Sequence, residues 1–178
     1  MLGVAVASIA KWIDAGQLKA GRTPGGHRRI AKKDLIEFLR RQGLPMPPEL
    51  AVPPPRVLVV DDETSITRWI AEEVRAVHAD YDVLEAHDGF AAGELVASHK
   101  PEVVVLDLRM PGMDGFEVCR RIKSRKETED IAVIAITAAS SGDVEARILE
   151  AGARVCLSKP LELDALLAEI DAAMATRR

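Results

Sequence analysis

The sequence is poor in cysteine, and this excludes two common ways of building a small protein. Only Cys119 and Cys156 occur among the 178 residues, and neither belongs to a CxxC pair or a cysteine–histidine cluster. Disulfide frameworks need several paired cysteines, and structural zinc sites need clustered ligands. We therefore expect neither, and this cysteine usage suits a reducing, cytoplasmic environment.

Long apolar runs are also missing. No stretch approaches the roughly 18 apolar residues that a membrane-spanning helix requires, so we expect no membrane insertion. The apolar opening MLGVAVASIA has no basic residue before it and soon reaches Lys11 and Asp14, which argues against a secretion signal. The chain is nevertheless 48% apolar, enough for a globular protein with a buried core.

The net charge of -4 conceals an asymmetry along the chain. Residues 1–44 hold nine Lys and Arg against three Asp and Glu, a net of +6, which leaves -10 for the remainder. Such a difference indicates two parts with different partners.

A proline-rich segment separates these two parts. Residues 44–56, LPMPPELAVPPPR, place six prolines among thirteen positions, which precludes a continuous helix or a paired strand. We predict a small domain at 1–44, a semi-rigid linker at 45–55 and a larger domain at 56–176.

After the linker, short β-branched runs alternate with amphipathic runs. This pattern predicts an α/β fold with a five-stranded, doubly wound parallel sheet. The predicted strands are Val57–Val60, Asp82–Ala86, Val103–Leu106, Ile131–Ile136 and Val155–Leu157. Five helices are predicted between and after these strands. Two are identified by apolar stripes, one of Ile66, Ile70 and Val74 and the other of Phe116, Cys119 and Ile122, and three lie near 89–98, 143–151 and 161–174.

Polar residues fall at the ends of these predicted strands. Asp61 and Asp62 follow the first strand and Asp107 the third, while Thr137 follows the fourth and Lys159 the fifth. Ligands of open α/β sheets bind at the carboxyl ends of the strands, so we expect these side chains to converge there.

Three carboxylates in one place raise each other's affinity for protons unless a cation compensates. Mg²⁺ prefers oxygen ligands and keeps several waters. We therefore predict a Mg²⁺ site at Asp61, Asp62 and Asp107, in which Asp62, Asp107 and the backbone carbonyl of Arg109 form a sufficient protein shell.

This arrangement predicts an acyl phosphate on Asp107. A carboxylate can accept a phosphoryl group when cations screen the incoming oxygens, and Lys159 supplies a fixed cation while Thr137 supplies a hydroxyl donor. Taken singly, a Thr at a strand end is ordinarily a cap and a Lys before Pro is ordinarily solvated, so the prediction depends on their joint occurrence. We do not expect an enzyme: a metal-dependent phosphohydrolase lacks an acid–base partner beside Asp107.

Four segments resemble the CheY-like receiver family. They are VLVVDDE at 57–63, VVVLDLRMPGMDG at 103–115, IAVIAITA at 131–138 and GARVCLSKP at 152–160. The acidic pair, the acceptor Asp, the switch Ser/Thr and the Lys-Pro follow the family's order. Asp62 precedes Asp107 by 45 positions, and Thr137 and Lys159 follow Asp107 by 30 and 52 positions. The resemblance implies a flavodoxin-like fold and phosphorylation of Asp107 by a sensor histidine kinase or phosphotransfer protein with Mg²⁺. It allows a homodimer through this domain, and the sequence leaves the oligomeric state open. Pro111 and Gly115 match the family's tight loop after the acceptor.

One position departs from that family. Receivers usually place Tyr or Phe three residues before the Lys, and this chain has Cys156 there. We expect the phosphorylation signal to run through Thr137 and the helix at 143–151, or to be weak. Redox sensing by Cys156 is disfavoured, because no neighbouring residue marks an activated thiolate.

The first 44 residues form a different pattern. VASIAKWIDAG is helix-like, AGRTPGGHRRI is basic around a Pro-Gly-Gly turn, and KKDLIEFLRRQG is a second helix-like run. The turn predicts a hairpin, and we expect the last helix to begin at Asp34 and to end at Gly43. The predicted core consists of Ile9, Trp12, Ile13, Leu18, Leu35 and Phe38.

WIDAGxL followed by TPGGHRRI resembles the winged helix-turn-helix domains of the MerR and excisionase type. The resemblance implies that Val6–Ala15 is a recognition helix with Ser8 and Lys11 facing the major groove. Phosphate or minor-groove contacts would come from Arg22, His27, Arg28 and Arg29. The first helix would be largely missing, with Leu2-Gly3-Val4 as the turn. We expect either a translation start upstream of Met1 or a degraded domain.

These observations together predict a response regulator in which phosphorylation of Asp107 controls DNA binding and transcription. The alternative is a phosphorelay or protein-interaction adaptor whose small N-terminal domain does not bind DNA.

Overall fold

The computed structural model describes residues 6–23, 25–47, 50, 53–112, 114–138 and 141–176. The chain forms two compact units, Met1–Pro53 and Pro54–Arg178. Within the described ranges, no helix has the length and apolar character needed to cross a membrane.

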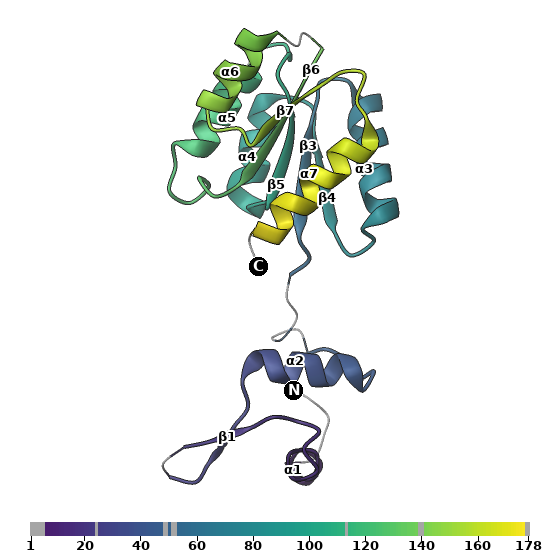
Figure 1. Ribbon diagram of the computed structural model, residues 1–178, viewed down its shortest axis with the longest axis vertical. Helices are drawn as coiled ribbons and strands as arrows, with labels where there is room; N and C mark the ends of the chain where they lie inside the picture. Colours follow the sequence, from purple (N-terminus) through teal and green to yellow (C-terminus); the bar gives the residue numbers. More distant parts are fainter. Residues whose placement is uncertain are drawn as a thin grey trace. The chain divides into compact units, whose positions relative to one another are not determined.

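The second unit is a five-stranded parallel sheet flanked by helices, in the strand order β4-β3-β5-β6-β7 (Figure 1). Its strands are β3 (Arg56–Val60), β4 (Asp82–Ala86), β5 (Val103–Asp107), β6 (Ala132–Thr137) and β7 (Val155–Ser158). Its helices are α3 (Thr64–Val77), α4 (Gly89–His99), α5 (Gly115–Lys123), α6 (Gly142–Glu150) and α7 (Leu163–Thr176). The predicted doubly wound parallel sheet is therefore confirmed.

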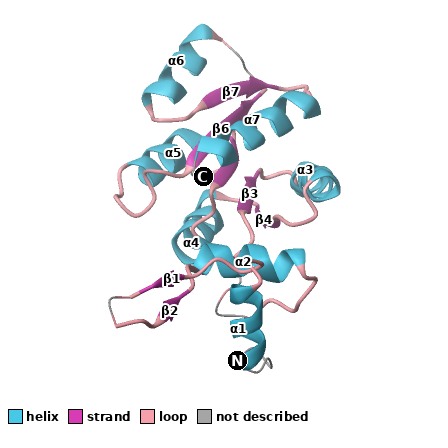
Figure 2. Ribbon diagram, turned by 60° about the horizontal axis from the view of Figure 1, so that its bottom comes forward, coloured by secondary structure: helices cyan, strands magenta, loops and turns pink. Residues whose placement is uncertain are grey.

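Two apolar layers hold this sheet, because successive residues of a strand point to opposite faces. One face packs against α3 and α7, and the other against α4, α5 and α6 (Figures 1 and 2). In β3, for example, Val57 and Val59 contribute to the first layer and Leu58 and Val60 to the second. Burial on both faces explains why β3 and β5 are almost continuously apolar.

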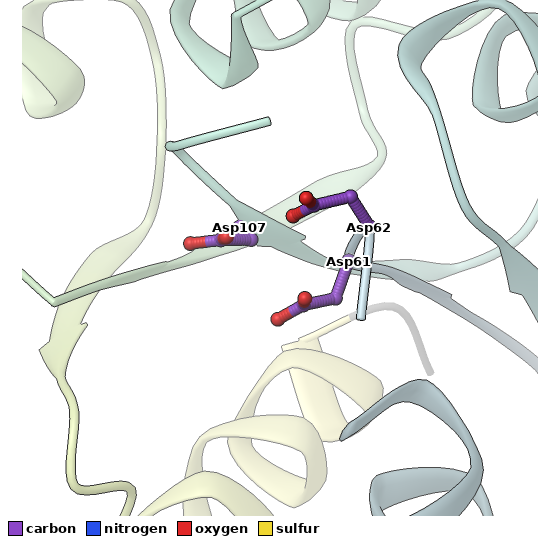
Figure 3. A group of neighbouring side chains, drawn as sticks. All are labelled: Asp61, Asp62 and Asp107. Atoms are coloured by element: carbon purple, nitrogen blue, oxygen red, sulfur yellow. The ribbon is translucent and has the colours of Figure 1, made fainter. Parts of the chain in front are cut away.

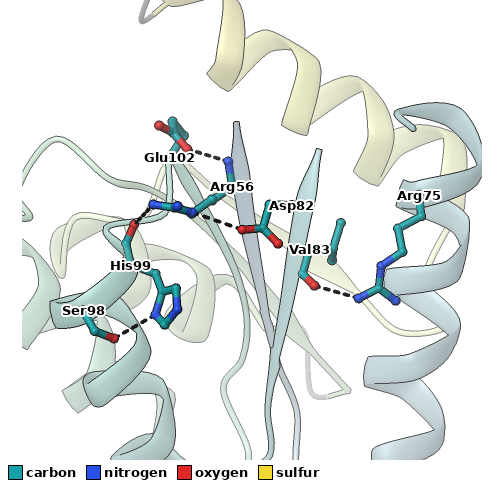
Figure 4. Close-up of polar contacts among 7 residues, drawn as sticks. All are labelled: Arg56, Arg75, Asp82, Val83, Ser98, His99 and Glu102. Atoms are coloured by element: carbon teal, nitrogen blue, oxygen red, sulfur yellow. Dashed lines mark hydrogen bonds and ion pairs between the residues drawn. The ribbon is translucent and has the colours of Figure 1, made fainter. Parts of the chain in front are cut away.

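Arg56 fixes the beginning of β3 at the amino edge of the sheet (Figure 4). Its backbone N–H donates to Glu102 Oε2 at 2.6 Å, and its guanidinium donates to Asp82 Oδ2 at 3.2 Å and to the carbonyl of His99 at 2.8 Å. These contacts join β3 to the residues that begin β4 and precede β5. They hold the three strands in register, so their carboxyl ends meet at the opposite edge.

The end of α7 lies at the same edge as the beginning of β3 (Figure 1). Late in α7, Asp171 Oδ1 lies 3.1 Å from Nε2 of His78, which ends α3. The chain therefore enters this unit and completes its last helix at the amino edge of the sheet.

The first unit contains α1 (Val6–Asp14), a two-stranded antiparallel hairpin and α2 (Lys32–Arg41). The hairpin pairs β1 (Gly21–Arg22) with β2 (Arg28–Arg29), as the Pro-Gly-Gly turn predicted. The buried centre of this unit is Leu18, Phe38 and Leu39. Trp12 lies with its ring centroid 4.9 Å from that of Phe38, which confirms its assignment to the core.

The boundaries of α2 correct one prediction and confirm another. The helix begins at Lys32 after Ala31, which makes no side-chain cap, so the prediction that Asp34 begins it was wrong. Asp34 lies in the first turn, where a negative charge favours the helix dipole. Gly43 ends the helix as predicted, with φ of 61°. Its N–H donates to the Arg40 carbonyl and the N–H of Leu44 donates to the Leu39 carbonyl, the pattern of a Schellman motif.

The small core also uses residues from the proline-rich segment. Met46 and Leu50 pack against it, so the first compact unit reaches into the range predicted as linker. The predicted turn Leu2-Gly3-Val4 lies outside the described residues.

Candidate functional site

Three carboxylates meet at the carboxyl edge of the sheet. Asp61 and Asp62 follow β3, and Asp107 is the last residue of the adjacent strand β5. One carboxylate oxygen from each residue lies within 4.8 Å of the others, and Figure 3 shows the three side chains directed into the same space. The sheet register thus joins residues that are 45 positions apart.

Asp61 is buried and bound by the protein at both oxygens. Its Oδ1 accepts the backbone N–H of Glu63 at 2.9 Å, and its Oδ2 accepts Nζ of Lys159 at 2.8 Å. Because both carboxylate oxygens already accept hydrogen bonds, Asp61 is placed to hold Lys159 and the residues that begin α3. Asp62, in contrast, is exposed.

Asp107 is only 4% exposed, and its Oδ1 has no hydrogen-bond partner. Its Oδ2 lies 3.5 Å from Nζ of Lys159. Burial is the largest influence on this carboxyl and raises its pKa. The charge of Lys159 and a hydrogen bond from the backbone of Arg109 lower the pKa, and the charge of Asp61 raises it, so that the net effect is a raised pKa. A buried carboxylate oxygen without a partner is costly.

A divalent cation would relieve that cost. Oxygen atoms of Asp62 and Asp107 are the donor type that Mg²⁺ prefers, and the unpartnered Oδ1 of Asp107 is available to such an ion. The residues present therefore fit a Mg²⁺ site. Arg109 follows Asp107 by two residues and is exposed.

Lys159 lies just after β7 and faces both buried carboxylates. Burial by itself lowers the pKa of its ammonium group, but the hydrogen bond to Asp61 and the charges of Asp107 and Asp61 outweigh this, so its pKa is raised. Lys159 therefore stays charged at neutral pH. Its backbone N–H donates to the carbonyl of Thr137 at 2.8 Å, which ties the end of β7 to the end of β6.

Thr137 is the last residue of β6 and is 1% exposed. The register places Ile136, its neighbour, opposite Asp107. The structure therefore brings the five predicted receiver positions to one edge of the sheet.

Gly115 occupies a position where the backbones of α5 and β5 nearly touch. A Cβ atom there would lie 2.7 Å from the Cα of Leu108 and closer still to the carbonyl oxygen of Asp107. The sequence assigned Gly115 to a tight turn. The structure gives a different reason, which is close packing of the first turn of α5 against the end of the site strand.

Cys156 is half-buried and lies beside Ala135 in the sheet. Burial raises the pKa of its thiol, and the charge of Glu145 raises it further. A raised pKa leaves little thiolate, which argues against redox sensing.

Sequence reasoning missed a contact between α5 and α6: the Arg147 guanidinium of α6 lies 4.7 Å from the ring centroid of Phe116 on α5.

The predicted DNA contacts are distributed over α1 and the hairpin. Lys11 is exposed and Ser8 is half-buried on α1, and the exposed hairpin residues are Arg22, His27, Arg28 and Arg29. Arg28 is also tied to α1: it donates to Asp14 Oδ1 at 2.6 Å and to the Ala10 carbonyl at 3.3 Å. Arg28 thus orients the hairpin against the helix.

Two families match the sequence. Residues 57–171 match the response regulator receiver domain, and residues 1–43 match a helix-turn-helix domain. The first match covers well over half of the chain.

Similar proteins include a transcriptional regulator and a response regulator. The DNA-binding dual master transcriptional regulator RpaA from a Synechocystis species is 33% identical over 118 residues, which cover 66% of this chain and 48% of that protein. Response regulator MprA from Mycobacterium ulcerans is 38% identical over 117 residues, which cover 66% of this chain and 49% of that protein. The chain thus spans about half the length of the curated relatives it matches.

Solved structures agree with the fold. A signal receiver domain of a DNA binding response regulator protein (merR) from Colwellia psychrerythraea is 36% identical with a TM-score of 0.66, covering 68% of this chain and 98% of that one. The receiver domain of a Francisella response regulator is 26% identical with a TM-score of 0.65, covering 70% and 99%. With the receiver match, the strand order and the carboxylate edge in agreement, this chain belongs to the response regulator receiver domain family and carries a helix-turn-helix domain before the receiver.

Proposed function

We propose that this chain is a transcriptional response regulator in which phosphorylation of Asp107 controls DNA binding by the N-terminal domain. The observation that carries the proposal is the buried, partly unpartnered carboxylate of Asp107, which lies close to an acidic pair and to the ammonium of Lys159. The donor would be a phosphohistidine of a sensor histidine kinase or of a phosphotransfer protein.

In the proposed reaction, an oxygen of Asp107 forms a bond to phosphorus as the phosphorus–nitrogen bond of the phosphohistidine breaks. The electron pair of that bond returns to the imidazole nitrogen, so no further oxidant or acid is needed. Asp62, Asp107 and the carbonyl of Arg109 would hold Mg²⁺, which neutralises charge on the phosphoryl oxygens when bound.

Two other residues would act on the phosphoryl group. Lys159 would lie beside it as a fixed cation, held in place by its 2.8 Å hydrogen bond to Asp61. Thr137 would donate its hydroxyl hydrogen to a phosphoryl oxygen. This would couple phosphorylation to the segment after β6 and so to α6, whose Arg147 contacts Phe116.

DNA binding would use α1 and the hairpin. In support, residues 1–43 match a helix-turn-helix domain, residues 1–44 carry a net charge of +6, and Lys11 is exposed on α1. Lys11 and Ser8 would contact base edges, and the hairpin arginines and His27 would contact the phosphate backbone or the minor groove.

Labelling with a small acyl-phosphate donor and Mg²⁺ tests the phosphorylation step. We expect one base-labile phosphoryl group on the wild type and on the control Asp130→Asn, an exposed acid in the turn before β6. Asp107→Asn should gain none, measured by intact mass. Labelling of Asp107→Asn at the wild-type level would refute the assignment.

A gel-shift titration at physiological salt tests the coupling. The affinity of the wild type for its DNA site, selected from a random duplex pool, should change on adding the donor, and that of Asp107→Asn should not. If the chain binds no duplex in either state, the adaptor alternative is favoured, since it retains phosphorylation without DNA binding.

A further inference from the structure

An open groove lies between α4 and α5, apart from the carboxylate site. Its volume is about 310 Å³, and apolar side chains of both helices line it, among them Val96, Val118 and Ile122. Gly93 widens the groove on the α4 side, because a Cβ atom there would meet nothing within 4 Å. None of the residues assigned to phosphorylation lines this groove.

Phe90 stands at the edge of the groove and is 70% exposed. It is more exposed than Trp69, Val77 or Leu149, the other large apolar side chains at the surface of the described residues. An aromatic ring beside an apolar groove is typical of a contact surface. Cavities of about 150 Å³ admit a benzene ring, so the groove has room for a phenylalanine side chain.

The rims of the groove carry opposite charges. Glu94 lies on the α4 rim, and Arg121 and Arg125 lie on the α5 rim. Arg121 already donates to Glu117 at 2.8 Å. Among the described residues, no ion pair joins the carboxylate of Glu94 or the guanidinium of Arg125, and the two do not pair with each other.

We propose that this groove binds a second copy of the chain, with Phe90 of each copy entering the groove of the other. A two-fold contact requires one surface to be its own complement. This patch has both a projecting ring and an apolar hollow, and both an unpaired acid and an unpaired base. A two-fold axis along the groove places α4 of one copy over α5 of the other, so Glu94 faces Arg125 twice.

A groove of about 310 Å³ makes only a small contact, so we expect a weak dimer that forms at high protein concentration. None of the residues assigned to phosphorylation lines the groove, so the test below uses the chain without a phosphoryl donor.

Sedimentation equilibrium of the full chain over a wide concentration range tests the proposal. Phe90→Ala should lower the association constant about tenfold or more, as truncation of a central aromatic anchor does. Gly93→Leu should abolish association by filling the groove, while its thermal stability rises, because Leu favours a helix more than Gly. Leu149→Ala, which removes an exposed apolar side chain on α6, is the control and should associate like the wild type.

A charge exchange tests the pairing itself. Glu94→Arg and Arg125→Glu should each weaken self-association, because each sets like charges against each other. An equal mixture of the two variants should associate like the wild type, since every mixed dimer then has two opposite-charge pairs.

Three results would overturn the proposal. These are a wild type that stays monomeric at every concentration, a mixture no stronger than the single variants, and a loss of association in Leu149→Ala but not in Phe90→Ala. The last result would place the contact on α6.

Discussion

The burial of Asp107 costs the fold stability, and in the proposed function it serves reactivity. Its Oδ1 has no partner and its pKa is raised by burial. An acid with a raised pKa binds its proton more tightly in the folded state than in the unfolded state. The fold therefore loses stability as pH rises from the ordinary carboxyl range through the raised pKa.

This gives a prediction for Asp107→Asn. Without Mg²⁺ at neutral pH, the variant should be more stable than the wild type by roughly 1–3 kcal/mol, the usual cost of a buried, unsatisfied polar group. The difference should vanish below the ordinary pKa of Asp, where both proteins are uncharged at this position. Urea denaturation at several pH values measures it, and a variant that is less stable at neutral pH would contradict the pKa argument.

Adding Mg²⁺ should reverse this difference in stability between the wild type and Asp107→Asn. An ion that binds only the folded wild type stabilises it in proportion to the logarithm of its concentration. Adding Mg²⁺ should therefore stabilise the wild type and leave Asp107→Asn nearly unchanged, in thermal melts at fixed ionic strength. Equal stabilisation of both proteins would show that Asp107 is not a ligand.

At the scale of elements, the packing of α5 against β5 makes Gly115 the most constrained glycine near the site. Gly115→Ala should cost about 1–3 kcal/mol, because the methyl group has no room beside the backbone of Leu108. The matched variant Gly93→Ala places a methyl group in open space within α4 and should stabilise by about 0.5–1 kcal/mol. Denaturant melts of the two variants should move in opposite directions, and a neutral Gly115→Ala would disprove the close approach.

The hairpin gives a second comparison between matched residues. Arg28 is bound to α1 through Asp14, and Arg29 is exposed on the next position of β2. Arg28→Ala should destabilise the first unit by about 0.2–1 kcal/mol, seen as faster hydrogen exchange in residues 6–41. Arg29→Ala should leave that exchange unchanged and only weaken DNA binding. Identical exchange in both variants would show that the Asp14 contact contributes nothing.

At the scale of the whole molecule, the charge asymmetry predicts how DNA binding depends on salt. Contacts from lysines and arginines release counterions from DNA, so affinity should fall steeply as salt rises. Arg29→Ala should reduce the slope of log affinity against log salt by about one, in fluorescence polarisation at several salt concentrations. A salt-independent affinity would refute phosphate contacts by the hairpin.

The receiver fold was predictable because its strands are β-branched runs with both faces buried, and because polar residues punctuate their carboxyl ends. Sequence spacing also placed Asp61, Asp62 and Asp107 together. It did not reveal that Asp61 is bound at both oxygens, or that Arg28 contacts Asp14, since both depend on three-dimensional approach. The groove at Gly93 and the Phe116–Arg147 contact were missed for the same reason. The start of α2 was misplaced because Ala31 makes no side-chain cap.

The amino edge of the sheet has a consequence for the architecture of such regulators. The chain enters the receiver at Arg56 and finishes α7 at that same edge, away from the carboxylates. An effector domain attached after α7, in place of one before β3, would therefore join the edge of the sheet opposite the three carboxylates. Both ends of this unit are therefore points of attachment at a distance from the carboxylates.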